Sequence, residues 1–418
     1  MTPRILLSAY QCAPGQGSVS QIGWEWYARM ARRASVTLVT HIRNKPFLEA
    51  AGTPLNGSEI IYIDTEWFAR RMYGAARFLF PGSEHSVFLL SSVDFFVYDR
   101  AALRTLAPRK SEWDVVHIVT PVSPSAHSVL GRLGLPVLRG PLNGGLRTPP
   151  NFPEFMRADS AWLYSLRDLA KPLQAVLNTP PSATFYANQS TWNALSPAER
   201  KHAERLPEIA VDPACFPAAP WPASPSATNP LQVLFVGRLI PAKALPLLFE
   251  GARRAHGRVP IEVTVIGDGP MRQTWEAESK ALPYPVHFLG SRNADEVSAA
   301  FAASHVFCLP SIRESGGAVL LEAMSAARPV IAVDYGGPAE LVNESVGRLV
   351  PADSSESVAA GIATALSEVI AQPNKWRQRG LAGRQHVLLN HTWDQRVQRG
   401  LAVCRKLNNT AIVRQEAP

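Results

Sequence analysis

The stretch 313–340 constrains the fold of this chain more than any other. Glu314 opens a turn of small residues, Ser315-Gly316-Gly317, and a largely apolar helical run follows from Ala318 to Ala327. A strand-like run, Val330 to Val333, comes next and leads into a second glycine turn. This order of glycine turn, helix and strand predicts an α/β unit.

The same stretch has the chemistry of a ligand site. Glycines before a helix let a ligand approach the backbone, and the helix N-terminus offers free N–H groups and positive potential to an anion. Glu322 is the one charged residue of the apolar helix. A buried carboxylate is costly unless something bonds to it, and the diol of a ribose would do so. In the alternative interpretation Glu314 caps the helix and Glu322 pairs with a core arginine. The residues alone favour neither.

The spacing of the two glutamates carries a resemblance. Glu314, seven residues and then Glu322, continued as EAMSAARPVIAVDYGGPAELV, are similar to the paired-glutamate signature of the family-4 retaining glycosyltransferases of GT-B fold. The resemblance implies that Glu322 holds the ribose of a nucleotide-sugar donor and that Glu314 lies against the donor sugar. It also assigns Ser315, Gly316 and Gly317 to the donor site. The family often has Gly-Phe-Gly there, so this variant would reshape the sugar pocket.

Two cations follow the strand expected at Leu231 to Val236. Arg238 and Lys243 flank the next turn, where backbone donors and positive charge suit a diphosphate. Solvated surface charges are the alternative. Gly237, Arg238 and Lys243 resemble the pattern with which these glycosyltransferases grip the donor diphosphate, although only three residues separate Leu239 from Lys243 here. Arg238 and Lys243 would then stabilise the leaving diphosphate without a metal.

The first half of the chain opens as a second α/β pattern. Strands are expected at Arg4 to Ala9 and Val36 to Thr40, with a helix from Gly23 to Arg33 between them. The loop after the first strand contains Gly15 and Gly17 and lies where ligands sit in doubly wound sheets. No GxGxxG fingerprint is present, so a simple dinucleotide site is not expected.

This loop resembles the N-terminal glycine loop of one glycosyltransferase subgroup, which reads Gly-Ser-Glu-Pro-Gly-Val-Gly-Trp. The matching residues run from Gly17 to Trp24, with Val19, Ser20 and Gln21 in place of the subgroup's Glu, Pro and Gly. The resemblance places Gly17 at the acceptor site, and Gln21 puts the backbone contact to the donor phosphate in doubt. A plain turn is the alternative.

Candidate acceptor-side residues follow two later strands. His117 lies in an expected strand, Asp114 to Val119, and the run Gly140 to Gly145 resembles the subgroup's second glycine loop. By this resemblance His117 is a catalytic candidate, and Asn143 and Gly144 would contact the acceptor. A hydrogen-bonded core histidine is the stronger alternative for His117, because the family's usual second histidine is replaced by valine.

The domain organisation follows from composition and alternation. A Pro-, Ala- and Ser-rich linker at 216–230 separates an N-terminal domain, 1–215, from a C-terminal donor domain, 231–390. The last strand of the first half is expected at Glu208 to Val211 and a helix at Trp162 to Leu177. The sequence therefore predicts an α/β protein of GT-B fold, with two Rossmann-like domains facing each other across a cleft. The resemblance adds that a C-terminal helix, 391–418, crosses back to the first domain.

Charge and cysteine usage limit the partners and the compartment. The 418 residues carry a net charge of +8, and no dense run of Lys and Arg suggests nucleic acid binding. No apolar run approaches the ~20 residues of a membrane-spanning helix. The apolar run within Met1 to Tyr10 is too short for the core of a signal peptide. The 4 scattered cysteines show no metal or disulfide spacing, which favours a cytoplasmic protein.

One segment leaves open a peripheral contact at the inner face of the membrane. Glu66 to Lys110 is rich in aromatic and basic residues. Such a segment suits an amphipathic surface on an anionic membrane. The favoured alternative is an insertion whose aromatics pack into their own domain.

We therefore expect a retaining glycosyltransferase that moves a sugar from a nucleotide-diphosphate sugar to an acceptor hydroxyl, without cofactor or metal. The subgroup resemblance suggests saccharide or lipid-linked acceptors in bacterial polysaccharide or glycolipid assembly. Two alternatives remain. One is a GT-B nucleotide-sugar epimerase, and the other is a catalytically degenerate protein that only binds sugar nucleotides.

Overall fold

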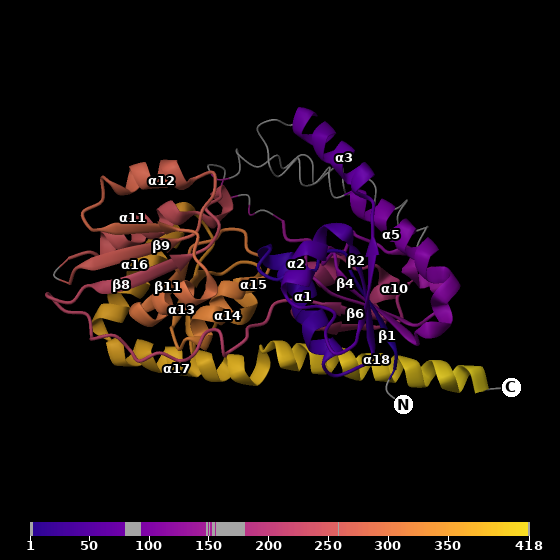
Figure 1. Cartoon of the computed structure of the whole chain (residues 1–418). Coiled ribbons are helices and arrows are strands. Elements are labelled where there is room, and N and C mark those ends of the chain that lie inside the picture. Colours follow the sequence, from indigo (N-terminus) through magenta and orange to yellow (C-terminus); the bar gives the residue numbers. More distant parts are fainter. Residues whose placement is uncertain are drawn as a thin grey trace. The chain divides into compact units, whose positions relative to one another are not determined.

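The chain forms two compact units in a computed structural model that describes residues 3–79, 93–147, 149, 151, 152, 155, 180–257 and 259–416. Unit 1 consists of Met1–Gly145, Asp159–Glu208 and Trp393–Pro418. Unit 2 consists of Leu146–Ala158 and Ile209–Thr392. The residues of the expected linker, 216–230, lie within the second range of unit 2. Figure 1 shows the elements of both units.

Unit 1 is built on a parallel sheet of 7 strands in the order β3-β2-β1-β4-β5-β6-β7. The strands are β1 (Ile5–Ala9), β2 (Val36–His41), β3 (Glu59–Ile63), β4 (Val115–Thr120), β5 (Val137–Leu142), β6 (Ala183–Tyr186) and β7 (Ala203–Arg205). The helices are α1 (Gly17–Ala31), α2 (Lys45–Ala50), α3 (Glu66–Leu79), α5 (Asp94–Leu106), α9 (Gln189–Ala194), α10 (Pro197–Arg200) and α18 (Trp393–Glu416). Short 3₁₀ turns lie at η1 (Ile42–Asn44), η2 (Ala107–Glu112) and η3 (Val129–Leu133).

Unit 2 repeats the pattern with 6 parallel strands in the order β10-β9-β8-β11-β12-β13. The strands are β8 (Leu231–Val236), β9 (Ile261–Ile266), β10 (Val286–Gly290), β11 (Val306–Leu309), β12 (Val330–Val333) and β13 (Gly347–Val350). The helices are α11 (Leu245–Ala255), α12 (Arg272–Ser279), α13 (Ala294–Ala303), α14 (Ala318–Ser325), α15 (Gly337–Leu341), α16 (Ser355–Ala371) and α17 (Pro373–Asn390), with a 3₁₀ turn η4 (Pro241–Lys243). Strands buried on both faces explain the continuous apolar runs of the sequence.

The expectation of two Rossmann-like sheets is confirmed, because in both units the order places the first strand in the middle of the sheet. The C-terminal helix α18, in yellow in Figure 1, belongs to unit 1, where it packs against α1 and β4. The chain therefore returns to the unit in which it began.

Two local expectations turn out differently, and a third is not tested. The strand expected at Glu208 to Val211 is wrong, because only an isolated bridge joins Val211 to Thr392, and the strand lies earlier, at β7. The first helix begins at Gly17 rather than Gly23, since a glycine with φ 73 can turn the chain directly into it. The helix expected at Trp162 to Leu177 lies outside the described residues.

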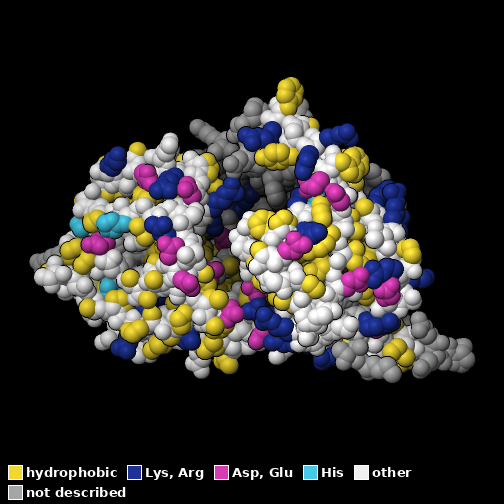
Figure 2. Space-filling view, viewed as in Figure 1, with side chains coloured by type: hydrophobic (Ala, Val, Ile, Leu, Met, Phe, Trp, Pro, Cys, Tyr) yellow, Lys and Arg dark blue, Asp and Glu magenta, His cyan; other side chains and the backbone are white. Residues whose placement is uncertain are grey.

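The aromatic segment of unit 1 divides into two parts. Phe95 and Tyr98 of α5 are buried in the core, as the packing alternative expected. Trp67, Tyr73 and Phe78 of α3 are 59%, 50% and 86% exposed, so the packing alternative does not hold for these three rings. Figure 2 shows hydrophobic and basic side chains next to one another where α3 lies.

Candidate functional site

Two glycine turns of the stretch 313–340 pack against each other at the carboxyl ends of β11 and β12. The N–H of Gly337 donates to the carbonyl oxygen of Glu314 at 2.8 Å. A Cβ atom on Gly336, whose φ is 68, would lie 2.3 Å from that oxygen. Only glycine fits this approach, so the second turn fixes the backbone of the residue that opens the first.

Lys243 and Glu314 form an ion pair across the edge of the sheet. The Nζ atom of Lys243 donates to Oε2 of Glu314, and each side chain is 16% exposed. The loops that carry them are also joined by a hydrogen bond of 3.1 Å from the N–H of Ile312 to the carbonyl of Ala242. The structure thus brings together the two expected donor-site residues that are far apart in sequence.

The charge of Glu314 is stabilised where it lies. Burial alone would raise the pKa of the Glu314 carboxyl, but the Lys243 ammonium and the N–H groups of Gly316 and Gly317 outweigh it and hold the pKa below its usual range. The N–H of Gly316 lies 3.4 Å from Oε1. Gly317, with φ 87, then starts α14. Glu314 is therefore ionised, and its carboxylate accepts hydrogen bonds from the turn 315–317 that leads into α14.

Glu322 lies on α14 without a partner. In the described part of the chain, no group forms a hydrogen bond or ion pair with its carboxylate. Burial raises the pKa of this carboxyl to about 7. The core arginine Arg328 donates instead to the carbonyl oxygens of Phe301, Pro220 and Ala302. The alternative in which Glu322 pairs with a core arginine is therefore wrong.

Gly237 and Arg238 follow β8, the neighbour of β11 in the sheet. A Cβ on Gly237 would lie 3.8 Å from Cε of Lys243, and the Arg238 side chain is exposed. A Cβ on Gly267 would lie 2.0 Å from the carbonyl oxygen of Gly237, so the turn after β9 packs closely against the loop after β8. The expected donor residues therefore gather at the carboxyl ends of three adjacent strands, β8, β11 and β12, where ligands bind in such sheets.

Two polar residues that the sequence analysis does not single out border these turns. Arg313 precedes Glu314, and Tyr335 precedes the second glycine turn. Their positions next to the glycine turns could have identified them in the sequence as further candidate site residues.

His117 is a core residue of unit 1. Its side chain is 0% exposed, and Nε2 lies 2.8 Å from the carbonyl oxygen of Gly140. The Trp26 ring meets it edge-on at 4.8 Å, and Gly400 of α18 lies against both rings. Burial lowers the pKa of His117 to about 4. This geometry supports the core alternative and offers the imidazole no open side toward a substrate.

Asn143 is engaged within unit 1. Its Nδ2 donates to Glu208, and its Oδ1 accepts from Nδ2 of Asn188 at 3.1 Å. The N–H of Gly144 donates to the hydroxyl of Thr191 at 3.0 Å. The side chain of Asn143 and the backbone of Gly144 therefore hold the loop after β5 in place.

The glycine loop after β1 is closed by the residue that departs from the subgroup pattern. The N–H of Gly15 donates to Oε1 of Gln21 at 2.8 Å, and Nε2 of Gln21 donates to Glu25 at 2.7 Å. Gly17 is exposed, with open space around its Cα. The Gln21 side chain thus occupies an N–H group of this loop and holds the loop against α1.

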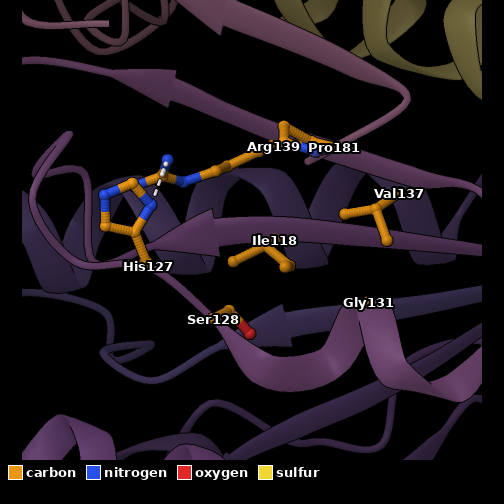
Figure 3. A pocket seen from close by; sticks show the side chains of 7 residues that line it. All are labelled: Ile118, His127, Ser128, Gly131, Val137, Arg139 and Pro181. Atoms are coloured by element: carbon orange, nitrogen blue, oxygen red, sulfur yellow. Dashed lines mark hydrogen bonds between the residues drawn. The ribbon is translucent and has the colours of Figure 1, made fainter. Parts of the chain in front are cut away.

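A small pocket of unit 1 has a structural explanation. Its lining residues are Ile118, His127, Ser128, Gly131, Val137, Arg139 and Pro181 (Figure 3). Arg139 is buried and pairs with Glu199 at 2.5 Å, and its other donors reach carbonyl oxygens of the loop 123–126. Figure 3 shows His127 turned toward this guanidinium, at 3.4 Å. The arginine anchors a loop and is not presented to a ligand.

Metal clusters and membrane-spanning helices can be judged only for the described residues. Within them, no group of three or more His, Cys, Asp or Glu side chains is placed to hold a metal ion. No helix in this part of the chain is long and apolar enough to cross a membrane.

A known family model matches most of unit 2. Residues 222–382 match the family model described as glycosyl transferases group 1. This part of unit 2 is therefore similar to a group 1 glycosyltransferase domain. The matched range contains the Lys243–Glu314 pair, both glycine turns and Glu322, so the gathered residues all lie in the part of unit 2 that matches the family model.

Curated relatives agree with this assignment over part of their length. A sulfoquinovosyl transferase of Arabidopsis thaliana is 36% identical over 113 residues, covering 27% of this chain and 21% of the relative. An alpha-maltose-1-phosphate synthase of Mycolicibacterium smegmatis is 30% identical over 189 residues, covering 42% and 48%. A glycogen synthase of Mycobacterium tuberculosis is 31% identical over 202 residues, covering 45% and 46%. The alignments thus span less than half of each of these relatives.

Solved structures show the fold of the whole chain. The Anabaena protein HepE, crystallised with UDP, has a TM-score of 0.63 at 16% identity and covers 96% of this chain and 99% of its own. WaaG, a glycosyltransferase involved in lipopolysaccharide biosynthesis, has a TM-score of 0.59 at 16% identity with the same two shares. The chain has the GT-B fold, as the sequence predicted.

Proposed function

We propose that this chain is a retaining glycosyltransferase that moves a sugar from a nucleoside-diphosphate sugar to an acceptor hydroxyl. The proposal rests above all on Glu322, a carboxylate without a partner among the described residues, which lies about one turn along a helix that starts beside the Lys243–Glu314 pair. A ribose diol would donate two hydrogen bonds to this carboxylate and so offset the free-energy cost of burying it without a partner.

The cations suit the leaving group of such a transfer. As the bond from the sugar to the diphosphate breaks, negative charge grows on the phosphate oxygens, and preorganised donors stabilise it. Arg238, Lys243 and the N–H groups at the start of α14 can supply these donors. We infer from these groups that transfer needs no metal ion, and that the neighbour crystallised with UDP makes a uridine nucleotide the first to test.

Retention of configuration and the acceptor class extend the family resemblance. Glu314 would lie against the donor sugar, and a saccharide or lipid-linked saccharide would be the acceptor, as in polysaccharide or glycolipid assembly. A nucleotide-sugar epimerase and a non-catalytic sugar-nucleotide binder are the competing functions. The transferase releases a nucleoside diphosphate and the epimerase a changed nucleotide sugar, while the binder releases nothing.

The deciding experiment compares the native protein with Glu322→Ala. Each is incubated with UDP-, GDP- and dTDP-sugars, with and without EDTA, and released nucleoside diphosphate is measured. Slow hydrolysis of one donor, unaffected by EDTA and lost in the variant, is expected. No release from any donor, together with no thermal shift by any nucleotide, would reject the transferase.

We propose in addition that α3 rests on an anionic membrane surface at the inner face of the cell membrane. Trp67, Tyr73 and Phe78 are exposed on this helix, and the guanidinium groups of Arg71 and Arg77 lie 5.9 and 6.0 Å from the rings of Trp67 and Tyr73. Exposed aromatics beside cations are typical of helices that lie in the interface of an anionic membrane.

Vesicle binding tests this proposal. The native protein should sediment with vesicles that contain phosphatidylglycerol and not with pure phosphatidylcholine. Trp67→Ala combined with Phe78→Ala should abolish sedimentation, while Phe47→Ala, which removes a ring 39% exposed on α2, should not. Equal sedimentation of all three proteins would contradict the proposal.

A further inference from the structure

A short segment between β5 and β6 belongs to unit 2, although the strands on either side of it belong to unit 1. The grouping includes Leu146–Ala158. Phe152 is 0% exposed and lies in the hydrophobic core of unit 2. Phe155 packs against the same core. This segment is therefore an integral part of unit 2, although it lies outside the residues that match the family model.

The segment contacts the second glycine turn directly. The hydroxyl of Tyr335 donates to the carbonyl oxygen of Arg147 at 2.6 Å. A Cβ on Gly336 would lie 2.9 Å from Cδ2 of Leu146 on one side and 2.3 Å from the carbonyl oxygen of Glu314 on the other. The turn thus lies between Leu146–Arg147 and Glu314, which brings Arg147 close to the candidate donor site.

Positive charge gathers on this side of the turn. The Arg147 side chain is exposed. Burial raises the pKa of Tyr335, and the guanidinium groups of Arg313 and Arg147 oppose that rise, so both cations lie near the phenol. The charges of Lys243 and Glu314 offset each other, whereas Arg147 and Arg313 add positive potential beside them.

We propose that Arg147 binds an anionic group of the donor and that Tyr335 positions it by holding its backbone carbonyl. The proposal rests on the donor site proposed above. A guanidinium offers parallel donors that match phosphate, carboxylate or sulfonate oxygens. The anion is either the diphosphate that every donor carries or an acidic substituent on the transferred sugar.

Calorimetric titration of the full chain with UDP, UDP-glucose and UDP-glucuronic acid tests the proposal. Arg147→Ala should weaken binding about tenfold, as expected for the loss of a charge-assisted hydrogen bond. A loss for all three ligands identifies the diphosphate, and a loss for UDP-glucuronic acid alone identifies an acidic sugar. Arg253→Ala, which removes an exposed arginine paired with Glu250 in the same unit, is the control and should bind as the native protein does.

Unchanged affinity of Arg147→Ala for every probe that the native protein binds would overturn the proposal. If uridine nucleotides do not bind the native protein, the same variants are titrated with GDP and dTDP. If these also fail, the proposed function itself is rejected, and this proposal with it. The two outcomes can be distinguished, because the native protein binds a nucleotide when only the Arg147 proposal fails and binds none when the proposed function fails.

The positioning role of Tyr335 has a separate readout. Tyr335→Phe removes one hydroxyl and should raise the KM for the donor about threefold while kcat stays the same, because part of the Arg147 contribution is lost. When Tyr335→Phe is combined with Arg147→Ala, it should not raise the KM for the donor beyond the value of Arg147→Ala alone. Independent, additive losses would show that Tyr335 does not act through Arg147, and a lowered Tm with unchanged KM would show a structural role only.

Discussion

The Lys243 ammonium lies against the Glu314 carboxylate, joining a loop after β8 to the turn that starts α14 across 71 residues of sequence. The pair links a cation expected at the donor diphosphate to a carboxylate expected at the donor sugar. A ligand that binds there therefore meets two charged groups whose positions depend on each other.

Lys243→Met should weaken nucleotide binding and destabilise unit 2. It removes a phosphate contact and leaves Glu314 without its counter-ion, and breaking such a pair is costly because the remaining charge is only slightly exposed. We expect at least about a tenfold loss of affinity. We also expect a lower Tm, by differential scanning fluorimetry.

The double variant with Glu314→Gln separates the two effects. It should recover most of the lost Tm, because no uncompensated charge remains, but not the affinity. Recovery of both would show that Lys243 serves only to balance Glu314.

Glu322 gives the site a pH dependence. Its pKa of about 7 means that the carboxyl of the free protein is mostly protonated at pH 6, whereas ribose hydroxyls need a carboxylate as acceptor. Nucleotide affinity should therefore fall as pH drops through about 7, by up to about tenfold per unit. The Glu322→Gln variant should bind the nucleotide weakly at every pH in a titration from about 5.5 to about 8.5, because its amide does not ionise in this range. A native profile that is flat over this range would contradict the prediction.

The same residue should cost stability. The pKa of Glu322 is raised in the folded state, so the folded protein holds its proton more tightly than the unfolded chain does. The contribution of Glu322 to stability is then most favourable at low pH and is lost as pH rises through about 7. Glu322→Gln should raise Tm by about 2–4 °C at pH 8, the shift expected for about 1 kcal/mol in a domain of this size. At pH 5 it should change Tm little, and equal shifts at both pH values would argue against burial as the cause.

The sequence predicts unit 2 well. Local spacing encodes β8, the turn with Arg238 and Lys243, and the stretch 313–340, and the carboxyl ends of adjacent parallel strands bring them together. The pairing of Lys243 with Glu314 follows from neither local pattern, since it depends on the sheet order β8-β11-β12.

The remaining features depend on contacts between distant segments. Nothing in the run after Gly145 indicates that Phe152 enters the core of unit 2 or that the Arg147 carbonyl meets Tyr335. Similarly, a histidine in a strand is compatible with a cleft or a core, and only the covering helix α18 decides that His117 is buried. The family resemblance predicted that a C-terminal helix returns to the first domain, but no pattern in the sequence showed that its Gly400 would lie against His117.

His117→Gln should reduce stability and leave the chemistry intact. The substitution keeps a donor near the Gly140 carbonyl but loses the ring contact with Trp26. We expect a lower Tm, with kcat of the folded protein within about threefold of native. A loss of kcat of about a hundredfold or more at unchanged Tm would instead support a catalytic role.

His117 should also contribute to acid sensitivity. Its pKa is lowered to about 4 by burial, so the folded state binds its proton less readily than the unfolded chain. The stability that this neutral histidine permits is present above about pH 6.5 and is lost as pH falls toward 4. The Tm of the native protein should decline over this window more steeply than that of His117→Gln.

Gly400→Ala should loosen the attachment of α18 to unit 1. A Cβ there would lie 2.4 Å from a ring carbon of Trp26 and 3.7 Å from Cε1 of His117, so the helix must move away from α1 and β4. Overpacking of this kind costs about 1–3 kcal/mol. Hydrogen exchange should increase along α18 before it increases in the strands, because the added methyl group acts at the surface between this helix and the sheet.

A second glycine serves as the control for that substitution. Gly74 lies inside α3, and a Cβ at this position would meet nothing within 4 Å. Gly74→Ala should therefore stabilise the protein slightly through its higher helix propensity, by up to about 1 kcal/mol. If both alanine variants unfold at the native temperature and α18 exchanges as before, the close packing of Gly400 against Trp26 does not hold α18 in place.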